Sequence, residues 1–498
     1  MSSDLNEKKG LSRLFNYRFV CSMMGRLCLF QLPLLLICGI LAVYYHDSGL
    51  NPILQTVCVM TALGLVLMGL GRSSHKYSAG RREGMITVAL CWFVISLVGM
   101  LPYWLGGYVP TVADAFFEAI SGFTTTGATV IADVESLPKS VLFWRSLTQW
   151  EGGLGIVVFA VAFLPVMGSG AAQLFVSETT GITHERFVPR TGTMAKWLVV
   201  IYLILTLVCA LLFWLGPMDL YEAVSHAATC LSTGGFSTRN ASLGAFQSDY
   251  IETIATIFMI LGATNFSVLY FTTIRKDRGR LWKDTEFRWF LGIIVVLTLI
   301  VSIWLVCKGI YTDFGGALFD SLVQIVSLIT TTGYTITDFD VWLTFFGMIG
   351  MFAMFISGCA GSTSGGLKTI RFVILLKYLM NELRKRTHPS AVIPVRINHL
   401  AIPGRVVHQV LIFFFAYLSL VYVCAIVVSL EGYSVEESLF TAISCISNSG
   451  PDVGKLGPTE NFGVLSAHSK VILSLLMVTG RLEIFTVVTL FHPGFWKH

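Results

Sequence analysis

Four short polar stretches with hydroxyl side chains and a glycine interrupt an otherwise apolar sequence. They read SGFTTTGATV, TCLSTGGFST, SLITTTGYTI and SCISNSGPDV, and they begin at Ser121, Thr229, Ser327 and Ser444. A dehydrated alkali cation needs oxygens in place of its water shell, and an extended hydroxyl-rich run before a glycine offers backbone carbonyls with little obstruction. The residues that could bind such a cation are Thr124, Thr125, Thr126, Gly127, Ser232, Thr233, Gly234, Gly235, Thr330, Thr331, Thr332, Gly333, Ser447, Asn448, Ser449 and Gly450.

The four stretches recur at a period of roughly a hundred residues, which indicates internal repeats. Thirteen positions before the shared glycine, every repeat has an acid: Asp114, Glu222, Asp320 and Glu437. We expect these acids in the first turn of a short helix, where the positive helix end favours them. The carbonyl end of that helix would then point into the membrane and favour a cation. A single TTTG is typical of an exposed turn, whereas four copies between apolar segments favour one common pore.

The elements that must position these stretches are membrane spans. The 498-residue chain is 54% hydrophobic and 13% charged, with a mean hydropathy of +0.73, which indicates a polytopic membrane protein. Apolar segments of spanning length, about 20 helical residues, are numerous. The ten candidates are residues 27–45, 53–70, 85–107, 141–167, 195–216, 250–274, 289–311, 342–381, 406–430 and 468–491. The first follows a basic leader without a small-residue cleavage site, so we expect a retained helix rather than a signal peptide.

Lysines and arginines near span ends indicate which loops are cytoplasmic. They concentrate in alternate loops: Arg72, Lys76, Arg81 and Arg82; Arg186, Arg190 and Lys196; Arg275, Lys276, Arg278, Arg280, Lys283 and Arg288; Lys377, Arg384, Lys385, Arg386, Arg396 and Arg405. Both termini are therefore expected on the cytoplasmic side. This topology explains the net charge of +5, and nucleic-acid binding is disfavoured because the basic loops lack interleaved aromatics. The eleven cysteines contain no C-x-x-C and indicate buried thiols rather than disulfides or zinc ligands.

The apolar segment 342–381 is too long for one span. About forty helical residues would extend roughly 60 Å, twice the hydrocarbon thickness. We expect a break at a run of small residues that includes Gly358, Gly361, Ser362, Thr363, Ser364, Gly365 and Gly366 and is followed by Lys368. A flexible loop below the third polar stretch could close a pore like a flap. The alternative is a small-residue packing seam between helices.

Arg481 lies near the middle of segment 468–491, where a charge is costly unless it faces water or a partner. Glu483 is poorly placed to pair with it, because residues two apart do not share a helix face. We favour a cavity-facing side chain, and an ion pair with Glu151 or another acid is the alternative. The role of Glu151, in QWEGGLG, stays open.

The order of span, short helix and span, with TTTGA, STGGF, TTTGY and SNSGP, resembles the Trk/Ktr/HKT superfamily of potassium transporters. Within it, GCAGSTSGGLKTIRF (Gly358 to Phe372) and GRLEIFTVVTLFHPGFW (Gly480 to Trp496) are similar to the TrkH family, the membrane subunits of bacterial Trk systems. The extra hairpin before the first repeat also favours this family, and the resemblance covers essentially the whole chain. The sequence departs from the family pattern at Glu151 and in the second and fourth stretches, which are not TTTG.

This resemblance implies an all-α polytopic membrane protein, with an N-terminal transmembrane hairpin and four span–pore helix–span repeats around one pore. It implies a potassium selectivity filter formed by the polar stretches, an intramembrane gating loop at Gly358–Gly366 and a barrier at Arg481. It also implies a homodimer in the cytoplasmic (inner) membrane, a cytosolic TrkA-like nucleotide-binding subunit on the basic loops, and no cofactor in this chain. The expected divisions are residues 1–80, 81–190, 191–284, 285–395 and 396–498, the first being the hairpin and the others the repeats.

Channel-like potassium uptake is the function that we expect, and an alternating-access symporter, coupled for example to sodium or protons, is the alternative. Repeats that all run in one orientation, each with one polar segment from the outside, favour the channel. An enzyme is not expected, because the sequence contains no metal-binding cluster and no convincing pair of nucleophile and base.

Overall fold

The structure, a computed structural model, describes residues 16–72, 81–162, 191–277, 279–337, 342–457 and 461–496. Helices provide nearly all the regular structure of these residues, and the one sheet found among them is an antiparallel hairpin of β1 (Arg396–Ile397) and β2 (Leu400–Ala401). The expected all-α fold is therefore confirmed. Four of the basic residues used to predict the topology, Lys76, Arg186, Arg190 and Arg278, lie outside the described residues.

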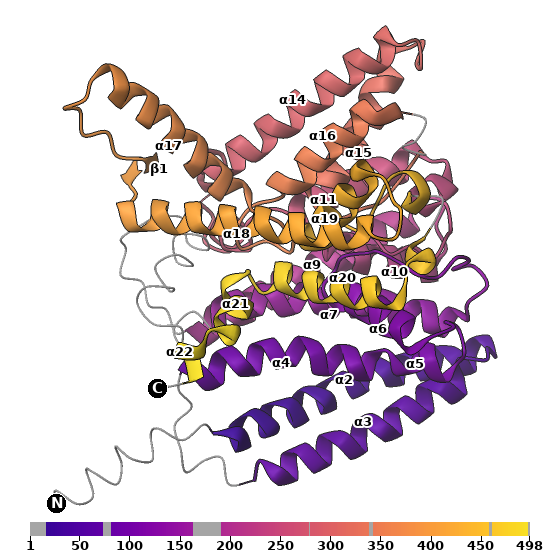
Figure 1. Cartoon of the computed structure of the whole chain (residues 1–498). Coiled ribbons are helices and arrows are strands. Elements are labelled where there is room, and N and C mark those ends of the chain that lie inside the picture. The colour runs from indigo at the N-terminus through magenta and orange to yellow at the C-terminus, as the bar shows by residue number, and fades with distance from the viewer. Residues whose placement is uncertain are drawn as a thin grey trace, which may run out of the picture.

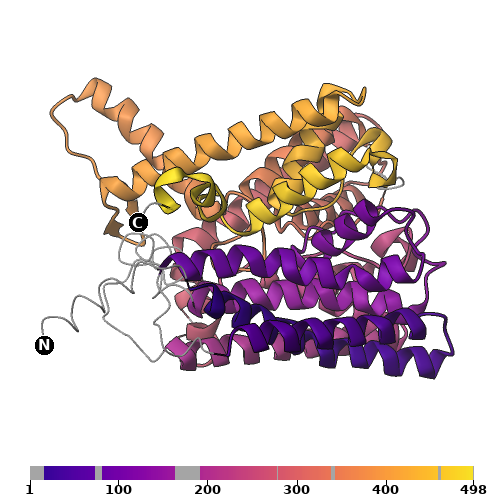
Figure 2. The ribbon, with the colours of Figure 1, turned by 60° about the horizontal axis from the view of Figure 1, so that its bottom comes forward.

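The first two helices form the hairpin that precedes the repeats. α2 (Tyr17–Tyr45) and α3 (Leu50–Leu70) lie side by side along one flank of the molecule (Figures 1 and 2). A Cβ added to Gly25 would lie 2.7 Å from the carbonyl oxygen of Gly64, so the two backbones are in close contact. Small residues permit such approach between helices in a membrane, where apolar burial alone does not drive association.

Four units follow, each with a long helix, a shorter pore helix and a second helix. The first unit contains α4 (Arg81–Gly99), α5 (Leu101–Leu105), the pore helix α6 (Val112–Phe123) and α7 (Lys139–Ala162). The second contains α9 (Thr191–Trp214), the pore helix α10 (Leu220–Leu231), α11 (Asp249–Gly262) and α12 (Phe266–Thr273). The third contains α13 (Arg280–Lys283), α14 (Thr285–Cys307), the pore helix α15 (Phe314–Ile329), α16 (Leu343–Ile356) and α17 (Thr369–Thr387). The fourth contains α18 (Gly404–Ser429), the pore helix α19 (Val435–Ser447), α20 (Ala467–Arg481), α21 (Phe485–Phe491) and α22 (Pro493–Trp496).

Only part of the ten-span prediction holds as written. Six described helices are long and apolar enough to cross a membrane, and the number reaches eight if each of two sharply bent helix pairs is one span. The predicted spans 250–274 and 468–491 are these bent pairs, with angles of 99° between α11 and α12 and 117° between α20 and α21. At the first bend, the Asn265 side chain caps α12 by accepting from Ser267 N at 2.8 Å. Span 141–167 corresponds to α7, and its last residues, 163–167, lie outside the described part.

Three of the four predicted acids lie in the first turn of a pore helix. Asp114, Glu222 and Glu437 each complete a capping box with the residue before the helix. The prediction is wrong for Asp320, because α15 begins at Phe314 and is capped by Asp313 instead. Asp320 therefore lies further along the helix, where its carboxylate accepts a hydrogen bond from the Tyr311 hydroxyl at 2.5 Å.

Two large clusters of buried apolar side chains hold the units together. One joins the hairpin to the first and fourth units, and the other joins the second and third units. At one end of the molecule, on the left of Figures 1 and 2, α17, β1 and α21 lie beyond the pore helices, and α14 and α17 diverge from each other. The last residues of the pore helices, Phe123, Leu231, Ile329 and Ser447, are fully buried, so the carbonyl ends of these helices lie inside the protein.

Candidate cation site

The four polar stretches share one unusual backbone conformation. The residue two positions before the shared glycine has a positive φ in every repeat: Thr125 54°, Thr233 52°, Thr331 57° and Asn448 56°. The glycines themselves also have positive φ: Gly127 84°, Gly235 77°, Gly333 82° and Gly450 95°. A β-branched residue in this region is a strained exception, and such strain is concentrated at functional sites. Because the sign of φ alternates from residue to residue in this way, successive peptide dipoles point in the same direction, whereas along a normal β-strand they point in opposite directions.

The four stretches touch one another in a closed ring. A Cβ added to each glycine would collide with a carbonyl oxygen of the next repeat: Gly127 with Gly234 at 2.1 Å, Gly235 with Thr332 at 1.9 Å, Gly333 with Ser449 at 2.1 Å, and Gly450 with Thr126 at 2.3 Å. The last contact returns from the fourth repeat to the first. The strands therefore surround a single axis, and only glycine lets the carbonyls approach so closely.

A cavity of about 140 Å³ opens beside this ring, and all four shared glycines line it. Arg145 and Asp452 also contribute to its wall. Gly127, Gly235 and Gly333 are half-buried, whereas Gly450 and the hydroxyl side chains before the four glycines are buried, so the polar stretches run from this cavity into the protein. Separate exposed turns on four repeats would not meet at one cavity in this way.

A second repeated contact braces three of the four strands from outside the ring. The pore-helix residue nine positions before the glycine bonds to the residue two positions after it: Glu118 to Thr129 at 3.0 Å, His226 to Ser237 at 3.0 Å, and Thr441 to Asp452. The equivalent residue of the third repeat is Gln324, whose two polar side-chain atoms are buried without a partner. Aligning the repeats nine positions before the glycine, where Glu, His, Gln and Thr interrupt the apolar pore helices, would have identified these residues from the sequence.

In the first repeat this brace includes a buried ion pair that the sequence analysis missed. Arg145 of α7 bonds to Glu118 at 2.8 Å, and the two side chains are 2% and 0% exposed. Its guanidinium also lies 4.0 Å from the ring centre of Phe236 and donates to the carbonyl of Ser237 at 3.3 Å. The pair therefore connects the first repeat to the second next to the candidate site.

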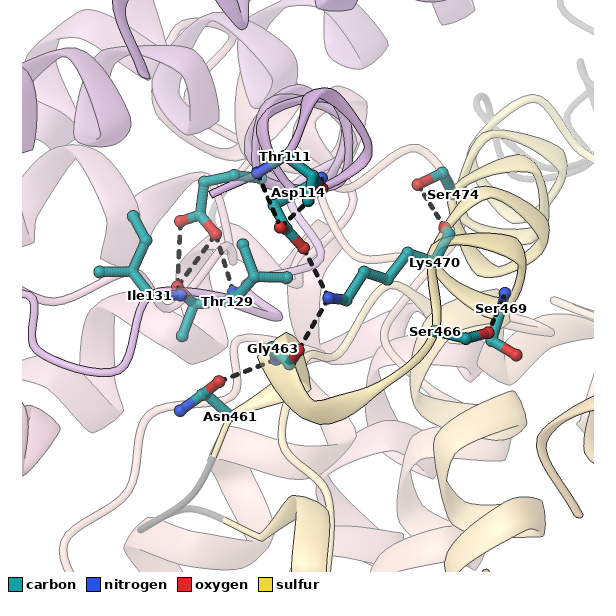
Figure 3. A network of polar contacts seen from close by, with 12 residues as sticks. Thr111, Asp114, Thr129, Ile131, Asn461, Gly463, Ser466, Ser469, Lys470 and Ser474 are labelled. Atoms are coloured by element: carbon teal, nitrogen blue, oxygen red, sulfur yellow. Dashed lines mark hydrogen bonds and ion pairs between the residues drawn. The ribbon is translucent and has the colours of Figure 1, made fainter. Parts of the chain in front are cut away.

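Two further side chains on neighbouring helices support the ring. Gln149 of α7, also missed, donates to the Gly234 carbonyl at 2.7 Å and accepts from Phe236 N at 3.0 Å. Lys470 of α20 bonds to Asp114 of α6 at 2.5 Å and to the Gly463 carbonyl at 2.8 Å (Figure 3). The ion pair with Asp114 joins the fourth repeat to the first.

The expected break after α16 is confirmed. α16 ends at Ile356 and α17 begins at Thr369, and the segment between them is irregular. Its Ser364 hydroxyl donates to the Thr330 carbonyl at 2.8 Å, and Gly365 N donates to the Thr331 hydroxyl at 3.0 Å. A Cβ on Gly365 would lie 1.9 Å from the Ser447 carbonyl oxygen. The segment is therefore packed against the ends of the polar stretches that lie away from the cavity.

Thr363 of this segment contacts the second repeat and Arg481. Its hydroxyl lies 3.1 Å from the Thr233 hydroxyl and donates to the Gly262 carbonyl at 2.9 Å. Its carbonyl accepts from Arg481 at 2.6 Å, and a second Arg481 nitrogen donates to the Gly152 carbonyl at 3.3 Å. Lys368 donates to the Ser364 carbonyl. The segment thus contacts the second, third and fourth repeats, and Arg481 connects it to the first.

The acids that could have paired with Arg481 have other partners. Glu483 pairs with Arg371 of α17, and Glu151 accepts long hydrogen bonds of 3.3 and 3.4 Å from Gln31 of α2. In the described part of the chain, no carboxylate lies within ion-pair distance of Arg481, whose Nε is buried without a partner. The ion pair with Glu151 that the sequence left open is therefore not formed. Glu151 instead connects the first repeat to the N-terminal hairpin.

The described residues contain no group of three or more His, Cys, Asp or Glu side chains that could hold a metal ion. All eleven cysteines are free, and most are buried as predicted, but Cys58 and Cys307 are exposed at the surface of the protein. The chemistry available at the ring is therefore that of backbone carbonyls and hydroxyls, which are hard oxygen ligands suited to an alkali cation.

Comparisons with known proteins agree with this arrangement. Residues 50–497 match the TrkH family, which is described as cation transport protein. The Trk system potassium uptake protein TrkH of Escherichia coli strain K12 is 36% identical over 485 residues, which cover 97% of this chain and 100% of that protein. The protein of the same name from Vibrio parahaemolyticus is 38% identical over 486 residues, with coverage of 97% and 99%.

A solved structure extends the similarity to three dimensions. The crystal structure of the potassium transporter TrkH from Vibrio parahaemolyticus matches with a TM-score of 0.89 at 36% identity, and the match covers 97% of this chain and 100% of that chain. A match of this extent includes the hairpin and all four repeats. The resemblance and the fold class inferred from the sequence are both confirmed.

Proposed function

This chain belongs to the TrkH family of cation transport proteins, and we propose that it takes up potassium across the cytoplasmic membrane through a channel-like pore. Membership of this family makes it a multi-pass membrane transporter and not an enzyme. Potassium is proposed because the relatives are named as potassium uptake proteins. The observation that carries the channel mechanism is the closed ring of contacts between filter glycines and carbonyls.

The filter in this proposal consists of residues 124–127, 232–235, 330–333 and 447–450. A potassium ion would exchange its water shell for their carbonyl and hydroxyl oxygens. Support comes from the repeated positive φ values, which present the backbone in the same way four times, and from the absence of any Cβ at the four contacts. The second and fourth stretches depart from TTTG but adopt the same conformation, so the departure leaves the ring intact.

The gate in this proposal is the loop Gly358–Gly366 with Lys368 and Arg481. The loop contacts the inner ends of the filter strands, so an ion could pass only after it moves. Arg481 would oppose an ion leaving the filter, because its charge is buried beside the loop and no carboxylate among the described residues neutralises it.

The cellular setting is also a proposal. We place both termini on the cytoplasmic side, since the basic loops alternate with sparsely charged ones. The relatives are components of a Trk system, which supports a cytosolic TrkA-like nucleotide-binding subunit that docks on the basic loops, and a homodimer of the membrane subunit. The divisions 1–80, 81–190, 191–284, 285–395 and 396–498 are kept as the hairpin and the four functional repeats.

Rubidium uptake into proteoliposomes that contain only this chain tests the proposal. We expect uptake driven by a membrane potential alone, inhibited by external potassium far more than by sodium. A variant shortened within Gly361–Gly365 is measured in parallel, so that a closed gate cannot explain slow uptake, and protein-free liposomes give the background.

Two outcomes would contradict the proposal in different ways. Uptake that requires a sodium or proton gradient would indicate an alternating-access symporter. Equal inhibition by sodium and potassium would reject the filter as a potassium-selective site.

A further inference from the structure

Glu286 is a buried acid that contacts the gating segment at two places. It lies in the first turn of α14, and it is 5% exposed. Its Oε1 accepts backbone hydrogen bonds from Ala360 at 2.7 Å and from Ile370 at 3.2 Å. Ala360 lies near the start of the segment, whereas Ile370 lies in the first turn of α17. One carboxylate oxygen therefore joins the two ends of the loop.

These contacts differ from the others at the base of the loop. Thr369 bonds to Gly358 and Ser357 through neutral groups of the same segment, at 3.0 and 2.7 Å. Within the described residues, Glu286 is the one acid bonded to any residue from 357 to 370. A hydrogen bond from a backbone N–H to a carboxylate is about twice as strong as one between neutral groups. Loss of this carboxylate would leave two buried N–H groups without a partner, which favours a different loop position.

The two residues before Glu286 are bonded to the turn between β1 and β2. In that turn, the Asn398 side chain accepts from Thr285 N at 2.7 Å and donates to Asp284 at 3.0 Å. Asn398 N also donates to the Thr285 hydroxyl at 3.2 Å. Asn398 has a φ of 48°, a left-handed conformation that asparagine tolerates. The hairpin turn is thus attached directly beside the residue that holds the loop.

We propose that Glu286 is a positioning residue that holds the gating loop against the filter. In this proposal the hairpin of β1 and β2 is attached to α14 through the Asn398 turn, and a movement of the hairpin releases the loop. A displacement of the hairpin moves Asp284 and Thr285, and Glu286 moves with them. Both bonds to the loop then lengthen together, because they share one oxygen. This inference rests on the proposed function, since it assumes that the loop is the gate.

The first test is rubidium uptake per molecule by full-length Glu286→Ala and Glu286→Gln in proteoliposomes. Glu286→Ala removes the acceptor, and we expect uptake about tenfold faster with an unchanged rubidium-over-sodium ratio. Glu286→Gln keeps an acceptor oxygen and should give a smaller increase. The matched control is Glu382→Ala, because Glu382 is a half-exposed acid of α17 that pairs with Lys385, and this variant should behave as wild type.

The second test addresses the attachment. Asn398→Gly keeps the left-handed turn but removes the amide, and we expect a several-fold increase in uptake. His399→Gly is its control, since His399 has a φ of 67° in the same turn and an exposed side chain. The double variant of Glu286→Ala and Asn398→Gly should conduct no faster than Glu286→Ala alone, because both changes release the same contact.

The outcomes separate this inference from the proposed function. Slower uptake by a folded Glu286→Ala protein, or an equal increase in the two controls, would overturn the inference. If Glu286→Ala does not fold, Glu286→Gln and Asn398→Gly decide the question alone. If the loop-shortened variant takes up rubidium faster and the Glu286 and Asn398 variants do not, the inference fails and the proposed gate stands. If neither wild type nor the shortened variant takes up rubidium, the proposed function itself fails.

Discussion

The two ends of the proposed filter, the outer end next to the cavity and the inner end next to the loop, are held by different chemistry. At the cavity end, one buried ion pair, Glu118 with Arg145 at 2.8 Å, supports the strands, and another, Asp114 with Lys470 at 2.5 Å, holds the start of the pore helix α6. Inside, the loop touches the strands through hydroxyl and backbone groups, such as Ser364 to the Thr330 carbonyl. Removing one partner of a buried ion pair costs about 3–5 kcal/mol, whereas a neutral hydrogen bond contributes about 0.5–1.5 kcal/mol. We infer that the two ion pairs form a fixed outer frame, whereas the neutral contacts of the loop can be broken one at a time.

The largest effect is expected at the outer frame. Glu118→Ala leaves the buried guanidinium of Arg145 without its carboxylate partner, so the free energy of unfolding should fall by about 3–5 kcal/mol. Thermal unfolding of the purified variant in detergent measures this loss. Glu135→Ala is the control, because its pair with Arg239 has side chains 43% and 44% exposed and should matter little. Similar melting temperatures for the two variants would show that the frame is not fixed by this pair.

The next effect concerns selectivity rather than stability. Gly127→Ser or Gly333→Ser places a Cβ 2.1 Å from a carbonyl oxygen of the next repeat, which must distort the ring. We expect sodium to compete with rubidium about tenfold better than in wild type. Gly309→Ser is a matched control, since Gly309 has a similar φ of 73° and nothing within 4 Å of its Cβ position. An unchanged potassium preference at normal protein levels would count against these glycines as the filter.

A smaller effect is expected at the inner end from Arg481→Gln. This change removes the charge beside the loop, and permeation should become several-fold faster while the fold stays intact, because no acid among the described residues loses a partner. The paired assay is thermal stability and rubidium flux per molecule. A destabilised variant with no gain in flux would contradict the proposed role of Arg481 as a barrier.

The smallest effect is expected at Gln324, the unbraced position of the third repeat. Both polar atoms of this side chain are buried without a partner, so Gln324→Met should change the free energy of unfolding by less than about 1 kcal/mol or increase it. Thr441→Val, at the equivalent position of the fourth repeat, removes the hydroxyl that donates to the buried Asp452 carboxylate. This variant should lower the free energy of unfolding more than Gln324→Met does. Equal losses in the two variants would mean that the third repeat is braced in the same way as the others.

The sequence predicted the repeated features better than the unique ones. Gly127, Gly235, Gly333 and Gly450 could be aligned because each repeat needs the same positive φ at the same place. The length of segment 342–381, which exceeds the membrane, predicted a break, and the run of small residues placed it at Gly358–Gly366. Arg145 and Gln149 were missed because each bonds to a strand of the second repeat that is far from it in the sequence, and only the folded chain brings them together. Glu118 was missed because the repeats were not compared nine positions before the glycine.

The helix boundaries predicted from the repeat pattern and from hydropathy were also wrong where a neighbouring residue set the first or last residue of a helix. Asp313 caps α15 earlier than the repeat predicted, so Asp320 left the first turn. The bends after α11 and α20 come at Thr264–Asn265 and at Leu482–Glu483, which a count of apolar residues does not detect. At the second bend, Glu483 has a φ of 56° and pairs with Arg371 of another helix. An ion pair of this kind stabilises the bend between two helices, but the amino-acid composition of the segment does not reveal it.

The most direct test of a fixed filter with a releasable inner loop is to shorten Gly361–Gly365 and to measure rubidium uptake and its inhibition by sodium in the same proteoliposomes. The loop would no longer reach the filter ends, so we predict faster basal uptake with an unchanged rubidium-over-sodium ratio. A folded variant that takes up less rubidium under every condition, or whose ion selectivity collapses, would show that the loop is part of the packing that holds the filter, and it would contradict the account.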